Sequence, residues 1–274
     1  MFKKSMPSVK IGGFASCGML TPEHYDYFIH FLEYIKARGL PLDFYSWHTY
    51  TSNLLDLRQN ALIARTTLDR FGYTRTESIL DEWNYLVKRP DVWGDLFAEG
   101  GAQARKEVFL ETSGITGAAF TSAALIEMCD LPIDIATFYD GQPVNIFCTI
   151  FDRFGFPTKQ YHAFEAFHWL VSCGERVGLA ADLPGIYAIA AGSSEKLGIL
   201  AANWGGETDW YPYEIIGLDP DLTYRYTLYL LDEYRALELV MDDTGKPVTL
   251  PHGLYLHHHS VAFVQYTAVH EPVS

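Results

Sequence analysis

The stretch ESILDEWNYL, residues 77 to 86, is the segment from which the fold can be worked out. Ile79 and Leu80 indicate a buried strand, and this strand runs directly into two adjacent carboxylates, Asp81 and Glu82. The next residues add an aromatic ring, an amide and a phenol: Trp83, Asn84 and Tyr85. Polar side chains gathered where a buried strand ends are typical of sites on the carboxyl edge of a parallel sheet.

Short apolar strands alternate with amphipathic helices on both sides of this stretch. Strands are expected at 8–15, 40–47, 77–83 and 132–139, and helices at 21–39, 52–71, 102–110, 115–129 and 159–173. Thr21 and Pro22 suit the start of the first helix, and Gly39 and Gly72 suit the ends of the first two. This alternation predicts a parallel sheet with right-handed crossovers. Since only four units are present, we expect α/β architecture in the form of half a (β/α)8 barrel over residues 1–174.

After Gly174 the pattern changes to short, often alternating apolar runs separated by Gly, Asp and Pro. The runs are GIYAIAAG, KLGILAANW, YPYEIIGL, TYRYTLYLLD, ALELVM and GLYLHHHSVAFVQYTA. Such spacing is typical of an all-β module. We therefore predict a C-terminal β-sandwich domain over residues 175–274.

The composition narrows the function classes. Acidic residues outnumber basic ones 34 to 20, and the net charge of −14 argues against nucleic acid and anionic membranes as partners. No apolar segment is long enough to span a bilayer, and the N-terminus does not read as a secretion signal, so a cytoplasmic location is expected. The four cysteines, Cys17, Cys129, Cys148 and Cys173, form no CxxC pair and are expected to be scattered thiols.

Neither a cofactor nor a metal is expected. The Gly-rich stretch GGFASCG lacks the residues of a phosphate-binding loop, and no GxSxG elbow occurs. His257 and His259 would share a face if they lay on a strand, but no acid or cysteine stands beside them at ligand spacing. We expect them to be surface residues of a strand.

Three of the four expected strand ends carry groups that titrate or donate hydrogen bonds. The second end provides Trp47, His48 and Tyr50, the third provides the 81–84 group, and the fourth provides Tyr139 and Asp140. Regular alternation would point Asp81 away from Glu82, so we expect Asp81 to have a structural role. The unusually high aromatic content, 15%, suits core packing and also sugar faces stacked on rings.

These strands resemble those of a known enzyme family. LDFYSWHTY, SILDEWNY and IDIATFYDGQP look like strands six, seven and eight of glycoside hydrolase family 39, the β-xylosidase and α-iduronidase group, and VKIGGFAS is similar to its fifth strand. DEWN alone is a weak motif, but the order and spacing of four strands make the resemblance more specific. The trailing β module also matches the family's layout.

The resemblance implies retaining hydrolysis of β-linked xylosides or glucosides, with Glu82 as the nucleophile. His48 and Tyr50 match positions near the sugar and the nucleophile, and Asn84 could donate hydrogen bonds there. Tyr139 is a further expected sugar contact, and Trp83 or Trp47 could either stack on a sugar or pack under the mouth of the barrel. A retaining enzyme also needs a second carboxylate about 5 Å from the nucleophile. The family places it after an Asn on strand four, and no Asn-Glu pair occurs in this chain.

A half barrel leaves two edge strands and an inner face uncovered, which favours association. We expect a homodimer or a larger homo-oligomer, because two copies related by a twofold axis could close eight strands. The last strand of one copy would then bring Asp140 opposite Glu82 of the other as the acid/base. A partner protein that supplies strands one to four could also complete the barrel, or the β module could cover the open face.

A different class of function stays open. The chain could be a catalytically inactive carbohydrate-binding or assembly protein that keeps the half barrel and sandwich. It could also be a truncated gene product whose other half is encoded separately.

Overall fold

The computed structural model describes residues 5–89, 91–143, 150–180, 183–207 and 209–270. The chain divides into two compact units. The first comprises Met1–Lys88 with Glu127–Asp140, and the second comprises Arg89–Ile126 with Gly141–Ser274. The domain boundary that the sequence predicts near residue 175 stays a prediction.

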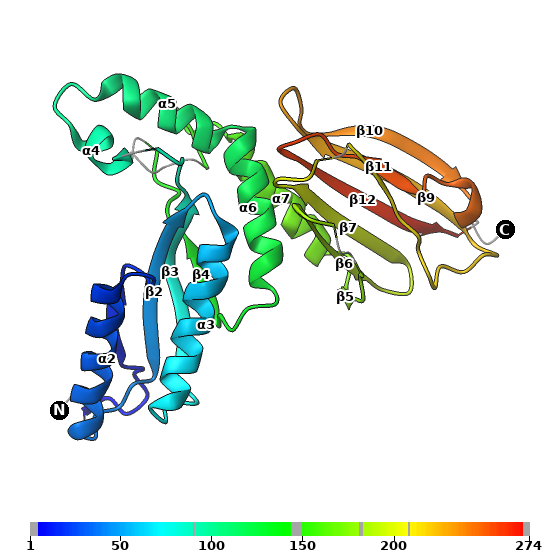
Figure 1. Cartoon of the computed structure of the whole chain (residues 1–274). Helices are drawn as coiled ribbons and strands as arrows, with labels where there is room; N and C mark the ends of the chain where they lie inside the picture. Colours follow the sequence, from blue (N-terminus) through cyan, green and yellow to red (C-terminus); the bar gives the residue numbers. More distant parts are fainter. Residues whose placement is uncertain (1–4, 90, 144–149, 181–182, 208, 271–274) are drawn as a thin grey trace. The chain divides into compact units, whose positions relative to one another are not determined.

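A parallel four-stranded sheet forms the centre of the first unit (Figure 1). Its strands are β1 (Gly12–Ser16), β2 (Phe44–Thr51), β3 (Glu77–Tyr85) and β4 (Ile135–Phe138). They lie side by side in chain order, and each neighbouring pair is parallel. The structure thus confirms a parallel sheet built from the four expected segments, and it is consistent with part of an α/β barrel.

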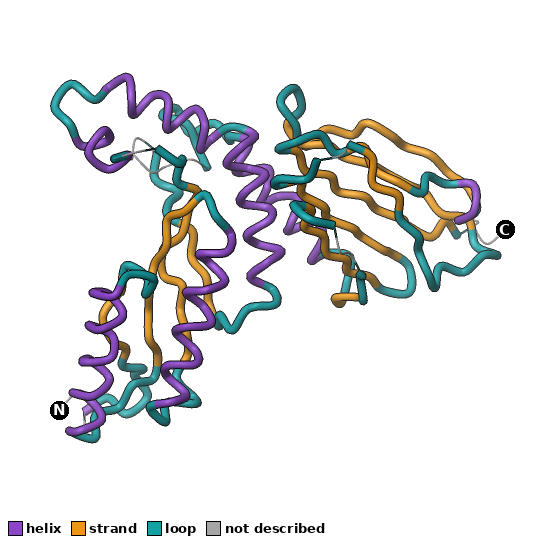
Figure 2. Tube along the Cα trace, in the orientation of Figure 1, coloured by secondary structure: helices purple, strands orange, loops and turns teal. Residues whose placement is uncertain are grey.

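Helices α2 (Pro22–Ala37) and α3 (Leu54–Arg70) run alongside these strands, as Figure 2 shows in purple and orange. The expected cap is present, since Thr21 Oγ1 accepts a hydrogen bond from His24 N at 3.3 Å. Asn53 caps α3 in the same way, with its side chain accepting from Leu55 N at 3.1 Å. Gly39 and Gly72 follow the two helices with φ of 56° and 90°, a conformation that favours glycine.

The two faces of this sheet differ sharply. On one face the Tyr45 ring stacks on Phe28 of α2 with centroids 4.1 Å apart, and Trp47 beside it on β2 is fully buried. Phe14 of β1 packs edge-on against Phe31 of the same helix. On the opposite face Ala15 is exposed and Ile135 keeps 48% of its surface exposed. Apolar packing against α2 and α3 therefore fixes which side chains point away from the helices.

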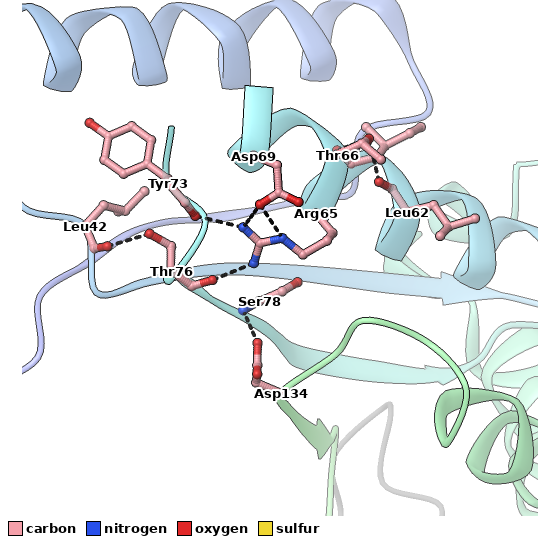
Figure 3. A network of polar contacts seen from close by, with 10 residues as sticks. Leu42, Leu62, Arg65, Thr66, Asp69, Tyr73, Thr76, Ser78 and Asp134 are labelled. Atoms are coloured by element: carbon pink, nitrogen blue, oxygen red, sulfur yellow. Dashed lines mark hydrogen bonds and ion pairs between the residues drawn. The ribbon is translucent and has the colours of Figure 1, made fainter. Parts of the chain in front are cut away.

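The amino ends of the strands are tied together by side chains (Figure 3). Asp134, just before β4, accepts from Ser78 N at 2.7 Å, and Asp43, just before β2, accepts from Ile11 N at 2.7 Å. Arg65 of α3 donates to Asp69 and to two carbonyl oxygens in the loop before β3: Tyr73 O at 2.8 Å and Thr76 O at 2.7 Å. This network sets the point at which β3 enters the sheet.

The second unit begins with helices α4 (Val92–Phe97), α5 (Ala102–Ser113) and α6 (Ile115–Met128), and the last two residues of α6 belong to the first unit. Helix α7 (Lys159–Val171) follows. Lys159 donates to the carbonyl oxygens of Asp232 and Arg235, at 2.5 and 2.8 Å, which ties the start of α7 to a β-hairpin. The sequence predicted α5, α6 and α7, whereas α4 lies in a segment expected to be a loop.

Two antiparallel sheets complete the second unit. Six strands pair in the order β10-β9-β12-β7-β6-β5, and β11 pairs with β8. Their bounds are β5 (Glu175–Val177), β6 (Ile186–Gly192), β7 (Lys196–Asn203), β8 (Trp210–Pro212), β9 (Thr223–Leu231), β10 (Ala236–Gly245), β11 (Gly253–Tyr255) and β12 (Ser260–Val269), with a short 3-10 helix at Pro247–Thr249. This arrangement is consistent with the expected β-sandwich.

One expectation about this module is wrong. His257 and His259 do not lie on a strand, because the run 253–268 breaks into β11 and β12 with both histidines in the connection. His259 has a φ of 55°, a left-handed conformation that cannot continue a strand. Its ring stacks on Trp204, with centroids 4.8 Å apart, and its Nδ1 lies 3.3 Å from the Thr116 hydroxyl.

Candidate active site

Glu82 and Tyr50 meet near the carboxyl ends of two adjacent strands. The phenolic oxygen of Tyr50 donates a hydrogen bond to Glu82 Oε2 over 2.6 Å. The strands pair His48 with Glu82 and Tyr50 with Asn84, so all four positions belong to neighbouring rungs of the sheet. Because Tyr45 and Trp47 point toward the helices, alternation sends Ser46, His48 and Tyr50 to the other face. Glu82 therefore lies on the face that the two helices leave uncovered.

A β-bulge at Asp81 puts the side chains of Asp81 and Glu82 on the same side of the sheet. Trp47 pairs with Leu80 and the next β2 residue, His48, pairs with Glu82, which leaves Asp81 as an extra residue in β3. The extra residue of a bulge interrupts the alternation, so two consecutive residues, here Asp81 and Glu82, point to the same face. Asp81 consequently points to the same side as Glu82, and the expectation that it faces the opposite side is wrong.

Asp81 lies beside His48. Its Oδ1 is 3.7 Å from His48 Nδ1, and the two side chains are 28% and 21% exposed. Burial raises the pKa of Asp81, and the neighbouring charge of Glu82 raises it further, whereas the Ser46 hydroxyl and His48 oppose that rise. Ser46 is a contributor to this site that sequence reasoning did not single out, because a strand serine carries no distinctive signal.

The fourth strand end also comes to this site. The Tyr139 ring meets the Tyr50 ring edge-on with centroids 6.4 Å apart. Asn84 is buried and donates to the carbonyl oxygen of Tyr139 at 2.7 Å, which joins the end of β3 to the residues after β4. The peptide bond between Tyr139 and Asp140 is cis. The structure thus brings five of the predicted residues to one edge of the sheet: His48, Tyr50, Glu82, Asn84 and Tyr139.

Burial and the neighbouring groups all raise the pKa of Tyr50. Burial is the largest cause that raises the pKa of Tyr50, and the hydrogen bond to Glu82 adds to it. The charge of Glu82 and the nearby Tyr139 and Asp140 raise it further. Tyr50 is therefore held in its protonated form and acts as a hydrogen-bond donor, and the influence of Asp140 places that carboxylate near the same group.

The two tryptophans lie elsewhere. Trp47 is fully buried on the helix face and donates to the Ser78 hydroxyl at 3.1 Å. Trp83 is 2% exposed, follows Glu82 in regular alternation, and packs edge-on against Phe138 with centroids 5.1 Å apart. Both rings are buried by packing, and the structure does not bring them to the Glu82 side of the sheet.

This edge can bind and polarise a neutral polar ligand. It offers a carboxylate oriented by a phenol, an imidazole next to a second carboxylate, and further phenol and acid groups after β4. No cluster of three or more His, Cys, Asp or Glu side chains suited to a metal ion occurs in the part of the chain that the structure describes. Likewise, none of the helices within those described ranges is long and apolar enough to cross a membrane.

Two of the four cysteines are free thiols, the exposed Cys17 and the buried Cys173, and Cys148 lies outside the described residues.

Comparison with solved structures identifies the fold. The glucosidase from Croceicoccus marinus superposes with a TM-score of 0.70 at 20% identity, over 98% of this chain and 62% of that protein. A Paenibacillus polymyxa xyloglucanase from glycoside hydrolase family 44 gives 0.60 at 10% identity, over 97% and 58%. BuGH86wt, solved in complex with neoagarooctaose, gives 0.58 at 13% identity, over 97% and 44%.

These similarities establish a fold rather than a family. The chain matches no protein-family model, and the comparison with curated proteins finds no match. It spans 62% of the length of the glucosidase and 58% of that of the xyloglucanase. The fold of this chain is therefore one that glycoside hydrolases use, and its resemblance to family 39 in particular stays a prediction from the sequence.

Proposed function

We propose that this chain is the nucleophile-bearing part of a retaining glycoside hydrolase, similar to family 39, that acts on β-linked xylosides or glucosides. The observation that supports it is the 2.6 Å hydrogen bond from Tyr50 to Glu82 on the carboxyl side of the parallel sheet. In barrels of this type the reacting groups are carried at that edge. The glycoside hydrolase fold supports the same conclusion.

The chemistry proceeds in two displacements. One oxygen of Glu82, Oε2, is held by Tyr50, so Oε1 is the oxygen that attacks the anomeric carbon. The glycosidic C–O bond breaks as the new C–O bond forms, and the leaving oxygen takes a proton from a second carboxylic acid. Water then attacks the anomeric carbon, gives its proton to that second carboxylate and releases Glu82. The net reaction adds one water across the glycosidic bond.

The second carboxylate comes from outside these four strands. The family's acid/base position has no counterpart in the sequence, since no Asn-Glu pair occurs. A second copy related by a twofold axis would place Asp140 of the partner subunit at that position. The exposed inner face and the unpaired outer edges of β1 and β4, within the described part of the sheet, favour such an association.

Covalent trapping tests the role of Glu82. A 2-deoxy-2-fluoro xyloside or glucoside with a good leaving group should label the peptide that contains Glu82, as mass spectrometry can detect. Glu82→Gln should abolish the label and the release of nitrophenol from a panel of nitrophenyl β-glycosides. Glu77→Gln is the matched control, because this carboxylate lies at the other end of the same strand. Labelling elsewhere, or turnover that survives Glu82→Gln, would refute the assignment.

Mixing two inactive variants tests the shared site. In a dimer that joins Glu82→Gln with Asp140→Asn, one of the two sites regains both native carboxylates. Since random mixing makes about half of the dimers mixed, about a quarter of the native activity should return. If Asp140→Asn keeps the native rate, or if mixing restores nothing, the partner subunit's Asp140 is not the acid/base.

One sequence observation favours a second candidate, a carbohydrate-binding protein without catalysis. It is again that the family's acid/base position has no counterpart on this chain. In that case methyl β-xyloside or methyl β-glucoside should bind, as calorimetry would show, while no nitrophenyl glycoside is cleaved. Turnover that depends on Glu82 would exclude this candidate.

A further inference from the structure

The bulge in β3 puts two carboxylates on the same side of the sheet. Leu80 is fully buried and pairs with Trp47 on the helix face, so alternation points Asp81 to the opposite side, toward His48. Regular alternation would then return Glu82 to the side of α2 and α3, where a carboxylate would be costly to bury because no water could solvate it. The extra residue keeps Glu82 on the side of His48 and Asp81 instead.

Two polar atoms face each other at this point without a hydrogen bond. Asp81 Oδ1 and His48 Nδ1 are 3.7 Å apart, beyond hydrogen-bond range but close enough for the carboxylate charge to attract an N–H group on that nitrogen. Both atoms are shielded from solvent, and neither has a hydrogen-bond partner among the described residues. A shielded carboxylate oxygen beside a ring nitrogen favours a proton on that nitrogen.

The position of that proton decides what the imidazole can do. A neutral ring carries one N–H donor and one acceptor nitrogen, and the partner of one nitrogen sets the state of the other. Two other groups near the ring do not compete for Nδ1. The Tyr50 ring is tilted, its centroid lies 6.4 Å from that of His48, and its hydroxyl donates to Glu82. The Ser46 hydroxyl interacts with the Asp81 carboxylate.

We propose that Asp81 is a positioning residue that holds His48 in the tautomer with its proton on Nδ1, so that Nε2 accepts a hydrogen bond from a sugar hydroxyl. This inference rests on the proposed function for its ligand. It makes His48 an acceptor at the same edge where Tyr50 is a donor. Once a bound sugar covers it, such an acceptor selects for ligands that carry the matching hydroxyl and against deoxy analogues, which leave it unpaired.

The tautomer can be measured directly by nitrogen-15 NMR of the imidazole rings. The whole chain is labelled and studied at about pH 8, well above the ordinary imidazole pKa. His48→Gln assigns the signals by their loss. We expect the Nδ1–H pattern for His48 in the native chain, although free histidine in water prefers the Nε2–H form. Asp81→Ala should convert His48 to the Nε2–H pattern.

Controls separate this effect from general disturbance. Glu82→Gln changes the adjacent carboxylate but not the atom that faces Nδ1, so it should leave the His48 pattern unchanged. If Asp81→Ala fails to fold, Asp81→Asn serves, and it should raise the Nε2–H population because the negative charge is lost. A native chain with the Nε2–H form, or a His48 pattern that neither variant alters, would overturn the proposal.

Sugar binding then distinguishes this inference from the proposed function. Asp81→Asn should weaken the binding of methyl β-xyloside or methyl β-glucoside roughly fivefold, the effect of one lost hydrogen bond, whereas Glu77→Gln should not. If the tautomer responds to Asp81 but the native chain binds neither sugar, the proposed function fails and the control of the ring by Asp81 stands. If sugar binds and the tautomer ignores Asp81, only this inference fails.

Discussion

Tyr50 gives the sharpest prediction for a single side chain. Tyr50→Phe removes only the hydroxyl that donates to Glu82 Oε2 at 2.6 Å. A hydrogen bond to a charged group contributes about 1.5 to 3 kcal/mol, so kcat/KM for nitrophenyl glycosides should fall about 10- to 100-fold. Tyr234→Phe makes the same change on a ring that is 83% exposed and should have no effect. An unchanged rate in Tyr50→Phe would show that this bond does not orient the nucleophile.

His259 should give the second unit a dependence on pH. Burial and the neighbouring His258 lower the pKa of His259 to about 4, below its ordinary value of about 6.5. The unfolded chain therefore takes up this proton more readily than the folded one. The contribution of His259 is complete above about pH 6.5 and is lost as the pH falls toward 4.

Urea unfolding of the second unit at several pH values measures this loss. His259→Asn keeps a residue that tolerates the left-handed backbone and should flatten the decline in stability between about pH 6.5 and 4. His252→Asn, at an exposed position, should leave the decline as it is. An equal slope in the native chain and His259→Asn would contradict the assignment.

For single residues, the sequence predicted which side chains meet but not the face to which each one points. The positions of His48 and Tyr50 follow from strand alternation. The shared side of Asp81 and Glu82 does not, because a bulge requires no particular residue and leaves the apolar pattern of Ile79 and Leu80 intact. A single slip in register moves a side chain to the other face, so one unpredicted extra residue was enough to put both carboxylates on one side.

At the scale of an element, Arg65 determines how firmly β3 is anchored. Its guanidinium spans Asp69 and the carbonyl oxygens of Tyr73 and Thr76, and its side chain is only 20% exposed. Lysine keeps the charge but cannot reach three acceptors with a planar fork. Arg65→Lys should lower the stability of this segment by about 1 to 3 kcal/mol.

Hydrogen exchange followed by mass spectrometry can locate that change. The amides of β3 should exchange faster in Arg65→Lys than in the native chain. Arg75→Lys alters an exposed arginine in the same loop and should leave the exchange unaffected. Equal protection of β3 in all three proteins would show that the network is not needed to hold the strand.

Elements were predictable where their ends carry distinct chemistry. Thr21, Pro22 and Gly39 mark α2, and its observed bounds lie close to the expected ones. Helix α4 was missed because six residues are too few to show a period. The strand expected at 132–139 is limited to Ile135–Phe138, since the chain bends at Asp134 and at Tyr139.

At the scale of the whole molecule, the open sheet predicts self-association. The outer edges of β1 and β4 have no neighbouring strand within the described part of the sheet, and Ile135 on β4 is 48% exposed. We expect light scattering at micromolar concentration to give the mass of a dimer or larger. Ile135→Lys should shift the mass toward one subunit, because an edge lysine opposes pairing. A native chain of single-subunit mass would refute closure by a second copy.

The anchored strand starts have a consequence for how such a protein can change over time. Asp43, Asp134 and Arg65 secure one rim of the sheet with contacts that do not involve the polar groups on the other rim. Substitutions near Glu82 can then alter ligand preference with little effect on folding. The rim secured by these three residues should tolerate little replacement, while the opposite one is where new specificities could arise.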